Sequence, residues 1–379
     1  MITRKLLNPV KIILKFYYQK YLFTTILLLN MIVSGAIIPD YYSQGSTTVK
    51  DGKKTSVVKQ SFGGRLHAKN FYSAVVDDKN TKWFLTDVGI VSFDDKKWSL
   101  HNKNVEIPNH NLKNFAFEIS PFGPELWIAS PKGATVASIP IDAKSGATTY
   151  HTQNSPIASD NVLSVAVGND SLRWFGTEKG ISAFLNDKWL EYTGYSYKRE
   201  YPESLFKSFP ITCMATSSDG NFLYAGTEGG GVARVFKNEV DGISGASVHA
   251  FWGPIDMPSD KVYSICIAPD GTQWYGTDKG IARHTGNRTL DNWTVFSTEN
   301  GLVNNFVQAI AIDMKGKLWF GTKGGVSVFD GSSWSSFTTN DGLKSNNIQC
   351  IAIDKNGIVW LGADNCIMSF NNDEFTIFK

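Results

Sequence analysis

Short apolar stretches alternate with glycine-rich turns over most of the chain, and one such unit recurs. Its clearest copy, residues 318–330, reads Leu-Trp-Phe-Gly-Thr, then Lys-Gly-Gly, then Val-Ser-Val-Phe-Asp. Apolar runs of four or five residues joined by glycines predict two strands and a tight hairpin. Other copies carry an aromatic residue at the same point, which gives the series Trp83, Trp127, Trp174, Tyr224, Trp274, Trp319 and Trp360. The spacings of 44, 47, 50, 50, 45 and 41 residues indicate the seven repeats of a β-propeller.

Each repeat is long enough for four strands. In residues 307–338 an apolar stretch precedes the hairpin, and Ser-Trp-Ser-Ser-Phe-Thr follows it. Apolar residues occur on both sides of these strands, as expected for a sheet that neighbours pack on both faces. The sequence therefore predicts an all-β fold, a single seven-bladed β-propeller over residues 56–379 with four antiparallel strands per blade. We expect the glycine after each aromatic residue to allow close approach of the next blade, and the threonine to hold the turn.

This repeat resembles a known family. The order of an apolar strand, Asp-x-x-Gly, Trp-Phe-Gly-Thr, x-Gly-Gly-Val and Trp-x-x-Phe is similar to the two-component regulator propeller repeat. The resemblance covers residues 56–379 and is strongest over 262–378. It implies the periplasmic sensor β-propeller of hybrid two-component systems from Bacteroidetes-type bacteria. Those receptors continue into a stalk, a transmembrane helix and a kinase, whereas this sequence ends in the expected outer strand of its last blade, so we carry over fold and recognition without signalling.

The first 36 residues have the pattern of an export signal. Basic residues reach Lys20, an apolar segment covers residues 21–33, and Ser-Gly-Ala at 34–36 offers a cleavage site. An uncleaved inner-membrane anchor is the alternative, since apolar character continues through residues 37–38. Both readings predict an exported protein, and together with the resemblance they imply a periplasmic, cell-surface or secreted protein of a Gram-negative bacterium.

Charge and histidine positions exclude some function classes. The chain has a formal charge of +2, but removal of the first 36 residues leaves 32 basic and 35 acidic residues. Such a balance provides no basic field for nucleic acid. The six histidines, at 67, 101, 110, 151, 249 and 284, match no catalytic spacing. We therefore predict a protein that is not an enzyme and has no cofactor or metal, with a propeller lyase or hydrolase as the less favoured alternative.

The residues that precede the first repeat suggest how the ring closes. Residues 37–55 are polar, and we expect them to form a flexible leader. Residues 56–61 resemble a fourth strand, because residues 64–70 echo the connection at 342–346. We expect that strand to pair at the edge of the last blade and help close the ring. The last blade has its own fourth strand at 374–378, so the sequence leaves open which strand is supernumerary.

The four cysteines are poorly placed for disulfides. Cys213 and Cys350 occupy equivalent inner strands on opposite sides of the predicted ring. Cys266 lies on a third inner strand, and Cys366 is two strands away from Cys350 within one sheet. We predict four unpaired, buried cysteines that act as small apolar residues.

The connections between blades are the first candidate site for ligand binding. The connection at residues 193–210 is the longest, and with the connection after it supplies Tyr195, Tyr197, Arg199, Tyr201 and Trp252. Aromatic faces flanked by charged groups suit sugar rings, so we expect an oligosaccharide or another small polar ligand there. Alternatively, the tyrosines only fold the long loop onto the rim.

The hairpin turns supply a second set of polar candidates. We expect them on the same face as the connections, around the central channel: Glu178, Lys179, Glu228, Asp278, Lys279, Lys323 and Asp364. They could orient a polar ligand, although ordinary turn chemistry also explains each of them. We predict a sensor-like module that recognises a ligand on this face. The alternative is a scaffold that binds a protein partner in a cell-envelope complex.

Overall fold

The structure covers most of the predicted propeller. The computed structural model describes residues 44–50, 53–60, 68–101, 112–141, 146–190, 195–196, 209–236, 247–251, 257–285 and 292–378. All of them lie in one compact unit, Ser43–Lys379. None of the helices within these ranges is long and apolar enough to cross a membrane. The export signal or anchor predicted at residues 1–36 lies outside the described residues.

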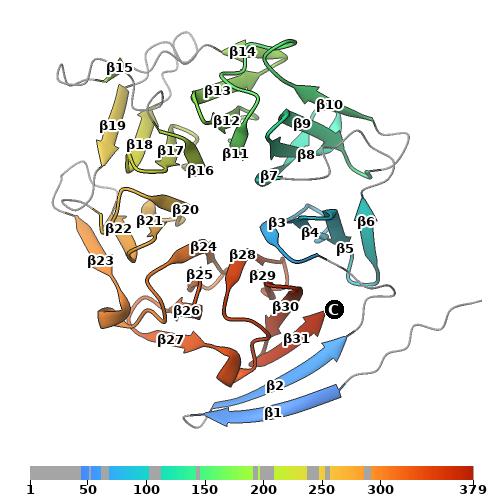
Figure 1. Cartoon of the computed structure of the whole chain (residues 1–379), viewed down its shortest axis with the longest axis vertical. Coiled ribbons are helices and arrows are strands. Elements are labelled where there is room, and N and C mark those ends of the chain that lie inside the picture. Colours follow the sequence, from blue (N-terminus) through green and yellow to red (C-terminus); the bar gives the residue numbers. More distant parts are fainter. Residues whose placement is uncertain are drawn as a thin grey trace, which may run out of the picture. The chain divides into compact units, whose positions relative to one another are not determined.

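Seven sheets make up the described chain, and each contains four consecutive antiparallel strands that run from inner to outer (Figure 1). The first blade consists of β3 (Phe71–Val76), β4 (Lys82–Thr86), β5 (Gly89–Phe93) and β6 (Trp98–His101). The second blade consists of β7 (Asn114–Ser120), β8 (Gly123–Ser130), β9 (Gly133–Ser138) and β10 (Ala147–Tyr150). The third blade consists of β11 (Val162–Val167), β12 (Arg173–Thr177), β13 (Gly180–Leu185) and β14 (Lys188–Leu190). The fourth consists of β16 (Ile211–Thr216), β17 (Phe222–Thr227), β18 (Val232–Phe236) and β19 (Ser247–Phe251).

The remaining three blades have the same plan. The fifth blade consists of β20 (Val262–Ile267), β21 (Thr272–Thr277), β22 (Ile281–Thr285) and β23 (Trp293–Phe296). The sixth consists of β24 (Val307–Ile312), β25 (Leu318–Thr322), β26 (Gly325–Phe329) and β27 (Trp334–Phe337). The seventh consists of β28 (Ile348–Ile353), β29 (Val359–Ala363), β30 (Cys366–Asn371) and β31 (Glu374–Phe378). The inner strands β3, β7, β11, β16, β20, β24 and β28 contact one another in that order, and β28 contacts β3. The ring is therefore closed, and the predicted seven-bladed propeller is confirmed.

The repeated glycine and threonine have the predicted roles. A Cβ atom on Gly321 would lie 2.9 Å from Cγ2 of Ile348 in the next blade, which is closer than side chains pack. The equivalent glycines meet the next blade in the same way, at 176, 226, 276 and 362. In the turn, Oγ1 of Thr322 donates to the carbonyl oxygen of Gly325 at 2.8 Å. Close packing between blades thus requires the glycine, and the hydrogen bond within the hairpin explains the threonine.

Aromatic side chains fill the space between most blades. Trp274 of the fifth blade is 3% exposed, and its ring centroid lies 5.8 Å from that of Phe320 and 5.9 Å from that of Phe329, both in the sixth blade. Tilted contacts of this kind contribute about 0.5–1.5 kcal/mol per pair beyond the area that they bury. The two-sided apolar pattern of the sequence therefore corresponds to packing between blades.

Two short 3-10 helices lie in the connections after the fifth and sixth blades, η2 (Thr298–Asn300) and η3 (Thr339–Asp341). Thr338 caps η3, because its side chain accepts a hydrogen bond from the backbone of Asn340. Gly342 ends the helix at a φ of 110°, in the left-handed region that glycine adopts without strain. This capping explains why the Thr-x-x-Asp-Gly-Leu sequence makes a compact connection.

Strands from the N-terminal side extend the last blade to six strands. β2 (Lys53–Gln60) pairs in parallel with β31, with Ser56 opposite Glu374. β1 (Gln44–Lys50) pairs with the outer edge of β2. The predicted pairing of residues 56–61 with the last blade is confirmed up to Gln60, and the N-terminal strand is the supernumerary one. Part of the flexible leader expected over residues 37–55 forms strands, since residues 44–50, with a Thr-Thr-Val stretch of high β propensity, form β1 and residues 53–55 begin β2. Residues 37–43, 51 and 52 lie outside the described residues.

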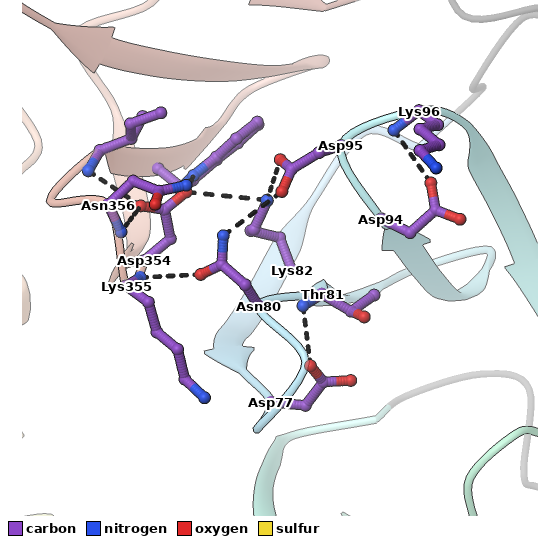
Figure 2. A network of polar contacts seen from close by, with 12 residues as sticks. Asp77, Asn80, Thr81, Lys82, Asp94, Asp95, Lys96, Asp354, Lys355 and Asn356 are labelled. Atoms are coloured by element: carbon purple, nitrogen blue, oxygen red, sulfur yellow. Dashed lines mark hydrogen bonds and ion pairs between the residues drawn. The ribbon is translucent and has the colours of Figure 1, made fainter.

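Polar side chains join the first blade to the last (Figure 2). The Lys82 side chain is fully buried, and its Nζ lies 3.7 Å from Oδ2 of Asp354 and also bonds Asp95. Oδ2 of Asp354 also accepts a hydrogen bond from Trp360 Nε1 at 3.1 Å. Asp354 and Asp313 both accept backbone N–H groups in their turns. The structure adds a second role for Asp354, because it pairs with a buried cation from the other end of the chain.

The four cysteines are free thiols, as predicted. Cys350 and Cys366 are buried, whereas Cys213 and Cys266 are half-buried, so the expected burial is complete for two of them. Desolvation raises the pKa of Cys213, Cys266 and Cys350 to about 12. These three thiols therefore stay protonated at neutral pH.

Candidate functional site

The propeller has two faces that differ in the segments that form them. We call loop face the side with the inter-blade connections and the turns between second and third strands. The backbone N–H of Glu228 donates to the carbonyl of Pro210 at 3.0 Å, and that of Lys323 to Phe306 at 3.2 Å. Each of these bonds joins a hairpin turn to the connection that precedes the blade. The prediction that connections and hairpin turns share a face is confirmed. The remaining turns of each antiparallel blade lie at the opposite end, which we call the turn face.

The long connection contributes little to the described part of the loop face. Tyr195 lies in β15 (Tyr195–Ser196), which pairs in parallel with β19 at the outer edge of the fourth blade. Its backbone is therefore far from the inner strands of that sheet. Four other predicted ligand residues lie outside the described residues: Tyr197, Arg199, Tyr201 and Trp252.

Two of the predicted turn acids hold the connections in place. Glu178 accepts hydrogen bonds from Asn161 Nδ2 at 3.0 Å and from Ser159 Oγ at 3.1 Å, and these bonds lower its pKa. Asp364 accepts from Asn347 Nδ2 at 2.8 Å and from side chains of the same blade. Both carboxylates are thus engaged by their own blade. Lys179 and Lys279 are exposed, and their backbone N–H groups donate to the threonine of the turn.

Lys323 contacts an aromatic pair that sequence reasoning missed, and the charges of Glu228 and Asp278 act on the same pair. The rings of Tyr263 and Phe306 lie 4.7 Å apart between centroids, and Lys323 Nζ lies 3.7 Å from the centroid of Phe306. Burial raises the pKa of Tyr263, and the charges of Asp278 and Glu228 raise it further. We call Glu228, Tyr263, Asp278, Phe306 and Lys323 the loop-face patch. Its residues come from three successive blades and the connection between two of them.

Asp278 differs from the other carboxylates of this face. It is half-buried, and its Oδ1 atom is inaccessible to solvent without a hydrogen-bond partner among the described residues. A carboxylate oxygen in such a place is stabilised by a donor. Lys323, by contrast, is exposed with its ammonium on the face of Phe306. The patch therefore combines an aromatic surface and the Lys323 cation with a carboxylate oxygen that has no donor within the described ranges.

Tyr263 is one of a set of residues that share a structural cause. A β-bulge occurs at the start of the inner strand in six blades, and the extra residues are Tyr72, Leu163, Thr212, Tyr263, Gln308 and Gln349. A bulge turns an extra side chain out of the paired register. In the sequence this position directly follows the first buried residue of each repeat, as in Val262-Tyr263. That offset is the signal that could have identified the set.

Hydrogen bonds link members of this set of bulge residues to neighbouring blades, from the sixth blade to the first. Gln308 Nε2 donates to Asn347 Oδ1 at 2.8 Å, and the backbone N–H of Phe71 donates to Gln349 Oε1 at 2.7 Å. Burial raises the pKa of Tyr72, and Asp87 raises it further. These side chains are held in position by neighbouring blades, which leaves a fixed polar surface beside the loop-face patch.

Histidine and metal chemistry has little support in the described residues. Burial lowers the pKa of His101, whose ring nitrogens contact Ser92 Oγ at 2.9 Å and the carbonyl of Ile141 at 3.3 Å. His284 is 3% exposed and bonds Gln273 Oε1 at 2.6 Å. Across the described ranges no three His, Cys, Asp or Glu side chains are grouped to hold a metal ion.

Comparison with known proteins agrees with the repeat pattern. The family model described as two component regulator propeller matches residues 301–324 and 342–365, so the chain carries these repeats in its last two blades. The extracellular domain of a putative hybrid two-component system from B. thetaiotaomicron superimposes with a TM-score of 0.63 at 21% identity, covering 81% of this chain and 40% of that one. A second such domain from B. thetaiotaomicron gives 0.60 at 17%, covering 86% and 39%.

Enzymes share the same fold. Virginiamycin B lyase from Staphylococcus aureus superimposes with a TM-score of 0.58 at 18% identity, covering 78% of this chain and 92% of the lyase. No curated protein sequence matches the chain. The chain spans about two fifths of the sensor domains that it matches. At these identities the similarity establishes the fold, and function must come from the site.

Proposed function

We propose that this protein is an extracytoplasmic, non-enzymatic recognition module that binds an oligosaccharide through the loop-face patch. The observation that carries this proposal is the Tyr263–Phe306 pair beside Glu228, Asp278 and Lys323. Aromatic rings provide flat apolar surface for a sugar ring, and charged groups bond its hydroxyls strongly.

The exposed Lys323 ammonium and the carboxylates of Glu228 and Asp278 favour a ligand that carries hydroxyl groups. A sugar hydroxyl can accept from the exposed ammonium of Lys323, and the aromatic pair is in place before binding. Preorganised groups of this kind cost little to order when a ligand arrives.

The similarity to extracellular sensor domains supports a location outside the cytoplasm. The apolar segment in residues 21–33 is consistent with that location, as a cleaved signal or as an anchor. In this proposal ligand binding is signalled to another protein by direct contact, because recognition of the ligand alone produces no output.

The test is thermal unfolding of the full-length protein with arabino-, xylo-, malto- and cello-oligosaccharides. A ligand present at about 100 times its dissociation constant should add about 2.7 kcal/mol to the free energy of unfolding. Tyr263→Ala should abolish that stabilisation, whereas Phe122→Ala, on an exposed side chain of the opposite face, should preserve it. A panel without any stabilising sugar would refute sugar binding, and stabilisation that survives in Tyr263→Ala would refute the patch as its site.

A protein-interaction scaffold is the second candidate function, and one observation favours it. Phe122 is 86% exposed and Ile119 is 61% exposed on the hairpin between β7 and β8, which extends further than the first turns of other blades. Exposed aromatic and aliphatic side chains on a short rigid hairpin suit burial against a partner. Cross-linking in cell envelopes should then detect one partner band with the native chain that Phe122→Ser loses, and an unchanged pattern would dismiss this candidate.

A further inference from the structure

Tyr72 of the first blade repeats the chemistry of Tyr263 in the fifth blade. Both tyrosines are the extra residue of the bulge at the start of an inner strand. Burial raises the pKa of each tyrosine, and the carboxylate in the hairpin turn of the same blade, Asp87 or Asp278, raises that pKa further. The bulges of four other blades carry no aromatic residue, since their extra residues are Leu163, Thr212, Gln308 and Gln349. Among these bulges, a tyrosine beside a turn carboxylate therefore occurs twice.

Tyr72 lies on the loop face and is open to a ligand. Its side chain is 36% exposed. The backbone N–H of Asp87 donates to the carbonyl of Asn70 at 3.3 Å, which joins the hairpin turn to the connection before the blade. Asp87 Oδ1 accepts the backbone N–H groups of Lys69 and Asn70, at 2.9 and 3.3 Å. These bonds hold the carboxylate in place, while its Oδ2 atom bonds none of the described residues.

A chain of hydrogen-bonded side chains leads away from the loop-face patch. It begins at Gln308, which follows Phe306 of the patch by two residues. Gln308 Nε2 donates to Asn347 Oδ1 at 2.8 Å, and so joins the sixth blade to the connection before the seventh. Asn347 Nδ2 and Gln349 Nε2 both donate to Asp364 Oδ1, at 2.8 and 3.3 Å. The chain of bonds thus crosses the seventh blade.

The same chain reaches the first blade. Gln349 Nε2 lies 3.3 Å from Asn70 Oδ1, and Gln349 Oε1 accepts the backbone N–H of Phe71 at 2.7 Å. Phe71 directly precedes Tyr72, so printed bonds connect the surroundings of the two tyrosines through the sixth and seventh blades. We call the bonded side chains the polar arc: Gln308, Asn347, Asp364, Gln349 and Asn70.

The polar arc is held by its own bonds and still has polar atoms for a ligand. All five of its residues are half-buried, so they form part of the surface. Gln308 Oε1 and Asn70 Nδ2 have no hydrogen-bond partner among the described residues, and a hydroxyl group can donate to the first and accept from the second. The bulge residues of the third and fourth blades offer less. Leu163 is apolar, and Thr212 Oγ1 donates to the carbonyl of Gly226 at 3.1 Å.

We propose that Tyr72 and Asp87 form a second saccharide subsite, so that one oligosaccharide lies along the polar arc between Tyr72 and the Tyr263–Phe306 pair. This inference rests on the proposed function, because it extends the loop-face patch to a longer ligand of the same class. The aromatic rings at the two ends provide flat apolar surfaces, and the arc bonds the hydroxyls between them. Once one end is bound, the other end meets its subsite at a high effective concentration, so a long chain binds more tightly than a short one.

Isothermal titration of the full-length protein measures the dependence on chain length. The probes are the disaccharide and the hexasaccharide of the arabino-, xylo-, malto- and cello-series. In the series that binds, the hexasaccharide should bind at least about tenfold more tightly than the disaccharide. Tyr72→Ala should reduce the hexasaccharide to the affinity of the disaccharide. The disaccharide itself should keep its native affinity in this variant, because the patch has the larger aromatic surface.

A second variant tests the carboxylate without removing the aromatic ring. Asp87→Asn should weaken the hexasaccharide about fivefold, since a hydroxyl bonds a charged carboxylate more strongly than an amide. The amide oxygen can still accept the backbone N–H groups of Lys69 and Asn70, so the turn is kept.

Leu163→Ala is the matched control, because it truncates a bulge residue that lies off the polar arc. It should bind both probes like the native chain. Equal affinity for the two chain lengths, or a native gain in both Tyr72→Ala and Asp87→Asn, would overturn the second subsite. The proposed function would survive that result if Tyr263→Ala abolishes binding of the disaccharide. Absence of binding by every probe would overturn both.

Discussion

Two interfaces of the ring share aromatic packing and differ in the buried ion pair that one of them adds. Between the fifth and sixth blades, Trp274 packs on Phe320 and Phe329, and the contacts are apolar. Between the seventh and first blades, Phe84 and Phe93 pack on Trp360 in a similar way. Lys82 is in addition buried against Asp354, and further polar contacts join the two blades. The first interface joins neighbours in sequence, which meet through a short connection. The second joins segments 275 residues apart, for which directional polar contacts define one relative position.

The apolar interface should show the largest loss on mutation. Phe320→Ala removes a side chain with 0% exposure from a site closed by two blades. We expect a loss of about 3–5 kcal/mol in the free energy of unfolding, from lost burial and a cavity. Equilibrium denaturation in urea measures it, with Phe122→Ala as an exposed phenylalanine control. A loss below that of the control would show that the interface is not a packed core.

The polar interface should respond to charge as well as to shape. Asp354→Asn keeps the size of the side chain but removes one of the two carboxylates that pair with Lys82, and should cost about 1.5–3 kcal/mol. Asp313→Asn is the matched control, because Asp313 has the same turn and tryptophan contacts without a cation partner in the described residues. The two variants are compared by urea denaturation at neutral pH. Equal losses would mean that the buried ion pair adds nothing beyond the turn.

Replacement of the glycine between blades should have an intermediate effect. Gly321→Ala places a methyl group 2.9 Å from Ile348 Cγ2, so one inner strand has to shift. Overpacking of this kind costs about 1–3 kcal/mol. Gly331→Ala is a poor match because of its positive φ, and Ser336→Ala on the outer strand of the same sheet serves as the control. Thermal unfolding of both variants checks whether only the first lowers the midpoint.

The smallest effect is expected at the interface of the fourth and fifth blades. Tyr275→Phe removes a buried hydroxyl without a partner in the described chain, and gives the residue found at Phe320. The free energy of unfolding should stay equal or rise by about 1 kcal/mol, since an unpaired polar group is removed. A clear loss in urea denaturation would instead reveal that this hydroxyl is bonded, for example by ordered water.

Local pattern was sufficient for the blades. The Trp-Phe-Gly-Thr phrase around Trp319 predicts the hairpin, the close approach and the turn, because all three depend on residues next to one another. The partner of Lys82 could not be predicted in this way, since Asp354 comes from the other end of the chain. The aromatic pair of Tyr263 and Phe306 was also missed, because a bulge in the inner strand decides where the tyrosine lies. The ligand-binding residues of the long connection were predicted from its length and composition, which do not show where its residues lie on the propeller.

The buried thiols have a consequence for how the chain must fold if it leaves the cytoplasm. In the folded ring a thiol with a pKa of about 12 is a poor nucleophile, so exchange with external disulfides is slow. In the unfolded chain all four cysteines have ordinary reactivity and can form mismatched bridges. Folding therefore competes with oxidation, and a molecule that closes its ring first is protected from it. A variant in which ring closure is slow should therefore be oxidised to non-native disulfides during refolding to a greater extent than the native chain.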